Sequence, residues 1–197
     1  MYRRKLTESP AMRRDTLKLI IKKLSSKYDR VKHHAKRVSI LCAATAKALG
    51  MNPQEITELR LCALLHNIGY IGLREELLNK RGSFTEIERA ELERHPEIGY
   101  QLLRAVSKYS SIAQYVLYHH ERIDGEGYPS KAAAEEIPLQ SRIIAIADAY
   151  DAMTSESSYR EKRSPSEAKE EIERNAGTQF DGEIVKVFVE KVLGKGK

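Results

Sequence analysis

The 197-residue sequence predicts an all-α fold, in which several helices pack around one hydrophobic core. Apolar residues recur three and four positions apart along most of the chain, the spacing that gathers them on one face of an α-helix. No segment sustains the alternation of apolar and polar residues that marks a half-buried β-strand. Capping residues and prolines stand where helical patterns begin, and no internal repeat or low-complexity linker separates those patterns.

Two helices are predicted in the first quarter of the chain. Residues 9–24 carry apolar side chains among basic ones, as an amphipathic helix does. We interpret this segment as a packing helix or a connector from an upstream sensor, in preference to a membrane-surface or DNA-binding helix. A longer helix follows, with His34 on its buried face and His33 turned away. We therefore divide the chain into an N-terminal helix or connector, residues 1–27, and a domain, residues 28–197.

A third helix is predicted to open at Asn52, which caps it, with Pro53 at its first position and Glu55 as the acidic partner of the cap. The inner face of this helix leads to His66. The sequence HNIGY then places two potential ligand side chains, His66 and Asn67, next to each other. The carboxyl end of the helix is therefore a candidate for part of a site.

Ser83 and Glu86 form the pattern of a capping box, which predicts a short helix at that point. His95 comes next, directly before Pro96. Because a residue before proline is pushed away from helical geometry, we expect His95 at a helix entrance, with its ring free to point into a cavity. That helix carries a core stripe of Ile98, Leu102, Leu103 and Val106.

An apolar helix then closes with the pair His119 and His120, and the loop ERIDGEGYP follows over residues 121–129. Glycine permits the positive φ angles that a tight loop needs. Two imidazoles roofed by such a loop would make a metal-binding or catalytic corner. Paired histidines could equally just end a helix, where cations suit the macrodipole. The loop side chains with ligand or acid–base chemistry are Glu121, Asp124 and Tyr128.

The run IPLQSRIIAIADAYDAMT, residues 137–154, is apolar enough to be buried nearly all round, which predicts a central helix. Asp148 falls on an apolar face of it, where an ionised carboxylate is costly unless paired, hydrogen-bonded or bound to a metal. We expect Asp151 nearer the helix surface or behind the ligands. A capping box of Ser164 with Glu167 predicts another helix. The stripe of a last helix consists of Ile184, Val187, Phe188 and Val192.

The composition indicates a protein of the reducing cytosol. The 34 basic residues are scattered among 28 acidic ones, so the net charge of +6 suggests a solvated surface more than a nucleic-acid footprint. Small phosphate-bearing ligands suit this charge equally well. Cys42 and Cys62 lie in apolar helical patterns and are expected to be core residues rather than a disulfide. No window resembles a membrane span or a signal peptide, so we expect a cytoplasmic protein without membrane insertion and without a specific nucleic acid partner.

Five of the 6 histidines fall at helix interiors or edges. Together with one aspartate they offer nitrogen and oxygen ligands from five helical segments. Such a set suits one or two divalent transition metals, with iron, manganese, zinc and nickel as candidates. A single buried histidine is commonly just a satisfied core residue, so the argument depends on the set. The candidate ligands are His34, His66, His95, His119, His120 and Asp148.

The order of these residues resembles the HD-GYP subgroup of the HD-domain phosphohydrolases. The matching motifs cover roughly residues 28–190, and the string HHExxDGxGYP is a specific signature; the others include HHAKRV, HNIG, HPEIG, IADAYDAMTS and QFDGEIV. The resemblance implies an HD-domain-like helical bundle with a pocket in its core, a centre of two or three metal ions held by the six candidate ligands, and hydrolysis of the bacterial second messenger cyclic di-GMP.

The resemblance also assigns roles to residues that the pattern alone leaves open. Asn67 stands where the family has a bridging aspartate, which makes it a candidate ligand and a candidate catalytic residue. Tyr70 stands where the family has a lysine thought to contact the substrate phosphate, so it is a second catalytic candidate. The candidates for substrate binding are Tyr128, Arg160 and Asp124.

Four positions depart from the family's pattern. Asn67 offers one neutral oxygen in place of two anionic ones, and so bridges two ions poorly. Tyr70 lacks the charge of the lysine, and Ser157 replaces an arginine common in the substrate-binding segment. Arg30 lies one turn before His34, where some members have a further metal-binding glutamate, and a cation there disfavours a third ion.

Three functions therefore stay open. The first is a metal-dependent cyclic di-GMP phosphodiesterase, with His34, His66 and Asp148 around one ion and the remaining three histidines around the other. The second is a catalytically degenerate module that binds cyclic di-GMP or a signalling protein through Glu121–Pro129. The third is an HD-type phosphohydrolase acting on another nucleotide or phosphoester. The apolar positions of residues 9–24 could also support a homodimer.

Overall fold

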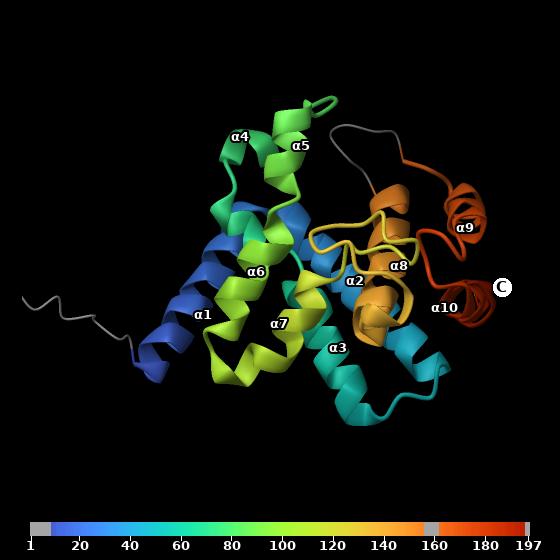
Figure 1. Ribbon diagram of the computed structural model, residues 1–197, viewed down its shortest axis with the longest axis horizontal. Helices are drawn as coiled ribbons and strands as arrows, with labels where there is room; N and C mark the ends of the chain where they lie inside the picture. Colours follow the sequence, from blue (N-terminus) through green and yellow to red (C-terminus); the bar gives the residue numbers. More distant parts are fainter. Residues whose placement is uncertain (1–8, 156–161, 196–197) are drawn as a thin grey trace, which may run out of the picture.

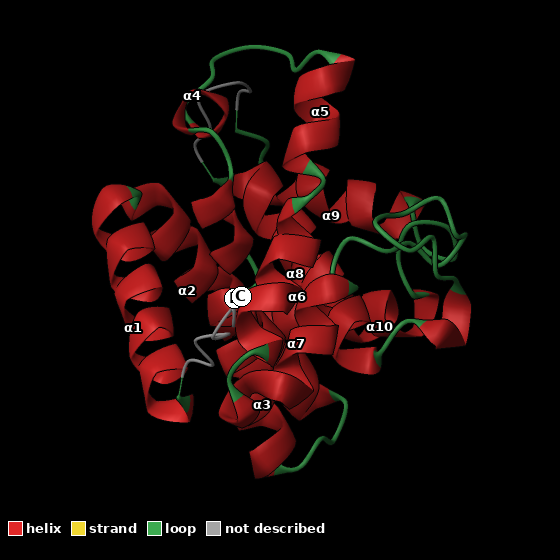
Figure 2. Ribbon diagram, turned by 60° about the vertical axis from the view of Figure 1, so that its left-hand side comes forward, coloured by secondary structure: helices red, strands yellow, loops and turns green. Residues whose placement is uncertain are grey.

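The computed structural model describes residues 9–155 and 162–195. The prediction of an all-α fold is confirmed: within these ranges the chain forms helices joined by turns and loops, and the only β-type pairing is an isolated bridge between Ala176 and Phe180. Figures 1 and 2 show the helices from two directions. The α-helices are α1 (Pro10–Lys27), α2 (Asp29–Ala48), α3 (Pro53–Leu65), α4 (Glu75–Leu78), α5 (Glu86–Leu92), α6 (His95–Arg104), α7 (Ser110–Leu117), α8 (Leu139–Thr154), α9 (Pro165–Arg174) and α10 (Gly182–Val187).

Short helical turns connect several of these elements. The turn η1, directly after α3, carries the glycines of the HNIGYIG sequence, and a π-type turn continues α10. The shorter elements are η1 (Ile68–Gly72), η2 (Ser107–Tyr109), η3 (Ala134–Glu136), η4 (Phe188–Val192) and η5 (Leu193–Lys195).

The predicted helix starts are mostly confirmed, with one correction. Asn52 and Ser164 cap α3 and α9 through reciprocal capping boxes, as predicted. The predicted box of Ser83 with Glu86 is wrong, because the cap of α5 is Thr85. The same spacing of hydroxyl and carboxylate occurs twice in this stretch. The later pair is used because the Thr85 Oγ1 accepts from the backbone of Glu88, whose carboxylate returns to the Thr85 N–H and also pairs with Lys80.

Helix α8 lies in the middle of the bundle, beside α2, with α9 and α10 on its far side in Figure 1. Several of its apolar side chains are fully buried, as expected for a central helix, whereas Leu139 and Ala152 near its ends are exposed; the fully buried ones are Ile143, Ile144, Ile146 and Ala147. Helix α2 packs against both α3 and α8, and α6 packs against α7 and η1. Cys42 and Cys62 are buried and not joined in a disulfide, as predicted.

The two ends of the described chain pack on this core. Leu17 and Leu24 of α1 are buried against α2 and η1, while Met12 and Leu19 are exposed. At the other end, the predicted stripe is partly wrong. Ile184 and Phe188 are buried, but their neighbours in the core are Val185 and Val189, and Val187 is partly exposed. No helix among the described residues is long and apolar enough to cross a membrane.

Gly69 permits the closest backbone contact near the predicted site. A Cβ atom at Gly69 would lie 1.9 Å from the carbonyl oxygen of His95 and 2.8 Å from the nitrogen of Gly99. Only a residue without a side chain allows η1 to approach the first turn of α6 this closely. The approach brings the end of α3, with His66 and Asn67, beside His95.

Candidate metal centre

Three of the histidines use the same local device. The Nδ1 atoms of His66, His95 and His119 lie 2.7, 2.7 and 2.5 Å from the backbone carbonyl oxygens of Ala63, Leu92 and Val116, each three residues earlier in the chain. A carbonyl oxygen can only accept, so in all three rings Nδ1 carries the proton and donates it. The lone pair is therefore on Nε2, the atom that each ring directs into the bundle.

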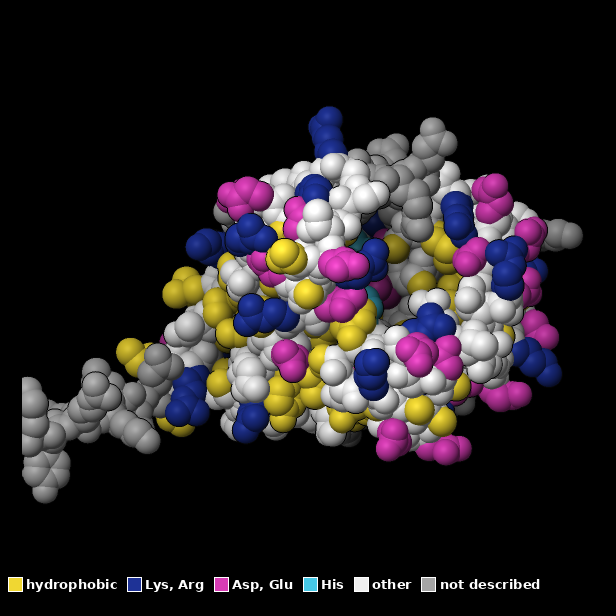
Figure 3. Space-filling model, turned by 45° about the horizontal axis from the view of Figure 1, so that its top comes forward, with side chains coloured by type: hydrophobic (Ala, Val, Ile, Leu, Met, Phe, Trp, Pro, Cys, Tyr) yellow, Lys and Arg dark blue, Asp and Glu magenta, His cyan; other side chains and the backbone are white. Residues whose placement is uncertain are grey.

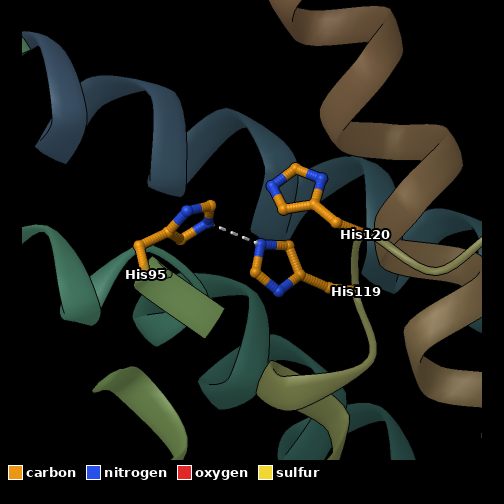
Figure 4. Close-up of side chains that lie close together, drawn as sticks. All are labelled: His95, His119 and His120. Carbon is orange, nitrogen blue, oxygen red and sulfur yellow. Dashed lines mark hydrogen bonds between the residues drawn. The ribbon is translucent and has the colours of Figure 1, made fainter. Parts of the chain in front are cut away.

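His95, His119 and His120 form one group of donors, called here the three-histidine group. One nitrogen from each ring lies within 4.8 Å of the others. Figure 4 shows His95 reaching the group from the start of α6, and the other two from the turn after α7. The Nε2 atoms of His95 and His119 are 3.3 Å apart. Two imidazole nitrogens bound to one ion at ~2.05 Å in tetrahedral geometry are separated by about 3.3 Å, so the spacing fits a shared metal.

His34, His66 and Asp148 form a second group, called here the mixed group, whose donor atoms also lie within 4.8 Å of one another. The His34 Nε2 lies 2.8 Å from Asp148 Oδ1, and the His66 Nε2 lies 3.5 Å from the same oxygen. These residues come from α2, the end of α3 and the central helix α8. His34 is on the buried side of α2 and His33 is exposed, as the helical spacing predicted.

Asp151 supports His34 from behind. Its Oδ2 lies 2.7 Å from the His34 Nδ1, and Arg37 donates two hydrogen bonds to the same carboxylate, at 2.6 and 2.9 Å. A carboxylate on the far nitrogen of an imidazole fixes the ring and is a common support for metal-binding histidines. The expectation that Asp151 lies behind the ligands is met, whereas a place near the surface is wrong, because Asp151 is buried. The residue is held inside by its two partners.

The two groups adjoin. The ring of His66 lies between those of His34 and His119, with ring centroids 5.3 and 5.2 Å apart. The five predicted histidines therefore form one continuous cluster with Asp148. Apart from the adjacent pair His119 and His120, consecutive members of this cluster are at least 24 residues apart in the sequence. In the face drawn in Figure 3, the surface is hollowed, and histidine side chains are visible inside the hollow between acidic and basic ones.

Burial sets the protonation of the three-histidine group. It lowers the pKa of His95 and His119 well below the usual value and that of His120 to about 4. These rings are therefore neutral at pH 7, which is the form that binds a metal. In the mixed group burial also lowers the pKa of His34, but hydrogen bonds to Asp148 and Asp151 outweigh it and raise the pKa to about 9. Burial opposes the charge of Asp148, yet the hydrogen bond from His34 and the charge of that ring hold its pKa well below the usual value.

The loop after the histidine pair folds over His120. The ring of Tyr128 stacks on that of His120, with centroids 4.8 Å apart and planes inclined by 27°. Glu121 is buried and accepts a 2.6 Å hydrogen bond from the backbone N–H of Ser130, so it fixes the returning end of the loop. Gly127 has no room for a side chain, because a Cβ there would lie 2.5 Å from the Cα of Glu121.

The other predicted site residues have different surroundings. The ring of Tyr70 meets that of His95 edge-on, with centroids 4.8 Å apart. The Asn67 Nδ2 lies 2.7 Å from the His66 Nε2, while its Oδ1 is buried and has no hydrogen-bond partner within residues 9–155 and 162–195. Among the described residues, Asp124 makes no contact with the histidines; its carboxylate pairs with Arg122 at 2.6 Å. Arg160 and Ser157 lie outside the described residues.

The donor set fits a divalent transition metal. In the three-histidine group, the Nε2 lone pairs of His95 and His119 converge with a ring nitrogen of His120, and the carboxylate of Asp148 lies in the adjoining mixed group. Sequence reasoning assigned no role to Arg37 or to the loop contact of Glu121, and placed Asp151 only loosely. A signal for Arg37 and Asp151 was present, because each lies three residues beyond a predicted ligand, His34 or Asp148, and so on the same helical face.

Comparisons with known proteins agree with this geometry. The family model of the HD domain matches residues 18–184. The chain is 37% identical over 173 residues to a cyclic di-GMP phosphodiesterase of Thermotoga maritima, covering 86% of this chain and 47% of that protein. It is 32% identical over 182 residues to the cyclic di-GMP phosphodiesterase response regulator RpfG of Xanthomonas campestris pv. campestris, covering 91% of this chain and 48% of the relative.

Among solved structures, the fold is similar to that of Bd1817, a HDG"Y"P protein from Bdellovibrio bacteriovorus. The TM-score is 0.70 at 18% sequence identity, and the match covers 98% of this chain and 66% of the other. The chain spans about half the length of the two curated relatives.

Proposed function

Because this chain belongs to the HD domain family, we propose that it is a metal-dependent phosphodiesterase that hydrolyses a cyclic dinucleotide, with cyclic di-GMP as the preferred candidate. The observation that carries this proposal is the convergence of the three-histidine group and the mixed group in one cluster. Two relatives that share about a third of their residues with the matched region are named as cyclic di-GMP phosphodiesterases, which supports the choice of substrate.

One set of residues would hold the metal ion, and another would position the nucleotide. The carbonyl partners of His66, His95 and His119 fix the tautomer, so that Nε2 is the donor before any ion arrives. A divalent ion held there would polarise a phosphodiester and lower the pKa of water. The candidate metals are iron, manganese, zinc and nickel, because imidazole-rich sites favour them.

Aromatic side chains flank the donors and would position the nucleotide. Tyr70 lies against His95, and Tyr128 stacks on His120, so both rings stand beside the three-histidine group. Aromatic side chains stack with nucleobases without regard to sequence, at about 1–3 kcal/mol per base. We propose that Tyr70 and Tyr128 contact the substrate. Asp124 is a weaker candidate because its carboxylate is engaged with Arg122.

The experiment is a hydrolysis assay on purified protein stripped with chelator and reloaded with Fe²⁺, Mn²⁺ or Ni²⁺. We expect linear dinucleotide from cyclic di-GMP, resolved by chromatography, with slower or no turnover of cyclic di-AMP. His120→Ala should abolish the product, whereas His33→Ala, an exposed histidine on the other side of α2, should not. Absence of product with all three metals would reject the enzymatic proposal.

A second candidate function is supported by Asn67. The amide offers one neutral oxygen where a bridging aspartate offers two anionic ones, and this oxygen is buried with no hydrogen-bond partner among the described residues. We propose, as the alternative, a non-catalytic module that binds a cyclic dinucleotide or a signalling protein through Glu121–Pro129 and does not hydrolyse the nucleotide. In that case calorimetry should detect binding of cyclic di-GMP to a silent wild type, and Asn67→Asp should create turnover.

A further inference from the structure

We propose that the three-histidine group binds one transition-metal ion, while Asn67 holds the mixed group closed by hydrogen bonds, so that no second ion enters. This inference rests on the proposed function only in requiring that the chain binds a metal. It assigns different roles to two donor groups that the residue types alone do not distinguish.

The three-histidine group needs a cation. The Nδ1 protons of His95 and His119 are both engaged by backbone carbonyls, so the Nε2 atoms that face each other at 3.3 Å both carry lone pairs. Neither atom can donate to the other. Two buried acceptors at this distance repel each other unless a positive species lies between them. Three protein ligands also leave coordination positions open, as in catalytic metal sites.

The mixed group differs, because its acceptors already have donors. The His66 Nε2 and Asp148 Oδ1 lie 3.5 Å apart, but each also lies within hydrogen-bond distance of an N–H group. The Nε2 of His34 is hydrogen-bonded to Asp148 at 2.8 Å, and its Nδ1 to Asp151 at 2.7 Å. The lone pair of the His66 Nε2 accepts from the Asn67 Nδ2 at 2.7 Å. The atoms that would hold an ion therefore already have partners. An ion entering here would have to break these contacts first.

Asn67 is the residue that makes the difference. The Nδ1 of His66 donates to Ala63, so the Nε2 of His66 can only accept, and among the described residues the amide nitrogen of Asn67 is the donor that meets it. An amide turned the other way would place two acceptors together. An aspartate has no N–H to donate. Asn67→Asp would replace a hydrogen bond by an acceptor–acceptor contact and add a negative charge, which together would draw a cation into the mixed group.

The test measures metal content directly. Protein stripped with chelator is incubated with Co²⁺ or Zn²⁺ alone, desalted and analysed by mass spectrometry of the metal against protein concentration. We expect about one ion per chain for the wild type and about two for Asn67→Asp, because the substitution creates a second site. The visible absorption of bound Co²⁺ should change in shape as well as intensity when the second ion enters.

Paired variants assign each ion to its group. His95→Gln and His120→Gln should lose the wild-type ion, whereas His34→Gln should retain it. In the Asn67→Asp background, His34→Gln should return the content from about two ions to about one. Circular dichroism checks that each variant is folded. Two ligands of the three-histidine group are substituted separately, so that the test stands if one of the two variants does not fold.

Three results would overturn the inference. The first is about two ions per wild-type chain, and the second is loss of the single ion in His34→Gln with retention in His120→Gln. The third is a metal content unchanged by Asn67→Asp, which would deny the role of the amide. None of these results depends on turnover of cyclic di-GMP, so failure of the proposed function and failure of this inference are distinguishable.

Discussion

His66, His95 and His119 each stand three residues after the residue whose carbonyl accepts a hydrogen bond from their Nδ1. At the scale of single residues, the sequence predicts which side chains are candidate ligands. It does not predict which ring nitrogen of each histidine carries the lone pair. Helical spacing placed His34 on a buried face, yet it could not show that Asn67 would donate to His66. That contact depends on the chain turning into η1 directly after α3, a feature of backbone geometry that residue types do not encode.

Removal of Asp151 tests the support behind His34. In Asp151→Ala the Nδ1 of His34 and the guanidinium of Arg37 lose their shared acceptor. We expect the free energy of unfolding of the metal-free protein to fall by about 3 kcal/mol, since breaking a buried charged network is costly. Urea denaturation measures this. The control is Asp124→Ala, which removes a more exposed pair with Arg122 and should cost about 1 kcal/mol or less. Equal costs would contradict the buried role of Asp151.

Glu121 is expected to order the loop rather than to bind the metal. Its carboxylate accepts from Ser130 and lies against the backbone N–H groups of Lys131 and Ala132. Glu121→Ala should speed hydrogen exchange of these three amides by about 10- to 100-fold, because a buried acceptor is removed. Glu126→Ala, an exposed change in the same loop, should leave that exchange unaltered. Unchanged exchange in Glu121→Ala would show that Glu121 does not anchor the loop.

At the scale of the elements, capping residues and prolines predicted most helix starts because they satisfy the same N–H groups in any fold. The error at Ser83 arose where two equivalent caps compete within five residues, and a tertiary contact to Lys80 favours the later one. The apolar stripe of α10 was shifted because the helix meets its neighbours on a face next to the predicted one. Packing partners decide such details, and spacing does not reveal them.

Gly69 tests whether the contact between η1 and α6 builds the site. In Gly69→Ala the new methyl group would overlap the carbonyl of His95, 1.9 Å away, so the two segments must separate. We expect a loss of about 1–3 kcal/mol in unfolding free energy and weaker metal uptake, because His95 moves from its partners. Thermal denaturation and metal content measure the two effects. Gly182→Ala, where a Cβ meets nothing closer than 3.8 Å, is the matched control. A stable Gly69→Ala protein with normal metal content would exclude this role.

At the scale of the whole molecule, the bundle brings together side chains from α2, the end of α3, the start of α6, the turn after α7, and α8. Periodicity predicted the helices and the buried faces. It did not predict which three ligands share an ion; that grouping came from the resemblance to the HD-GYP subgroup. Long-range assembly depends on how α2, α3 and α8 cross, which no local pattern specifies.

The two cysteines report on the integrity of this core. Cys42 and Cys62 are fully buried in α2 and α3, and burial raises the pKa of both thiols. We expect neither to react with Ellman's reagent in the native protein, and both to react once denaturant unfolds it, because the thiolate is the reactive form. Reaction of either thiol at a rate independent of denaturant would show that α2 and α3 do not pack as described.

The most direct test of the account is the position of a bound ion. Crystals of the protein loaded with Co²⁺ or Mn²⁺ should give an anomalous difference peak at the metal edge. We predict that peak at about 2.1 Å from the Nε2 atoms of His95 and His119 and from a ring nitrogen of His120. A peak at any other cluster of side chains, or none among these three rings in metal-loaded crystals, would contradict the metal centre and the function built on it.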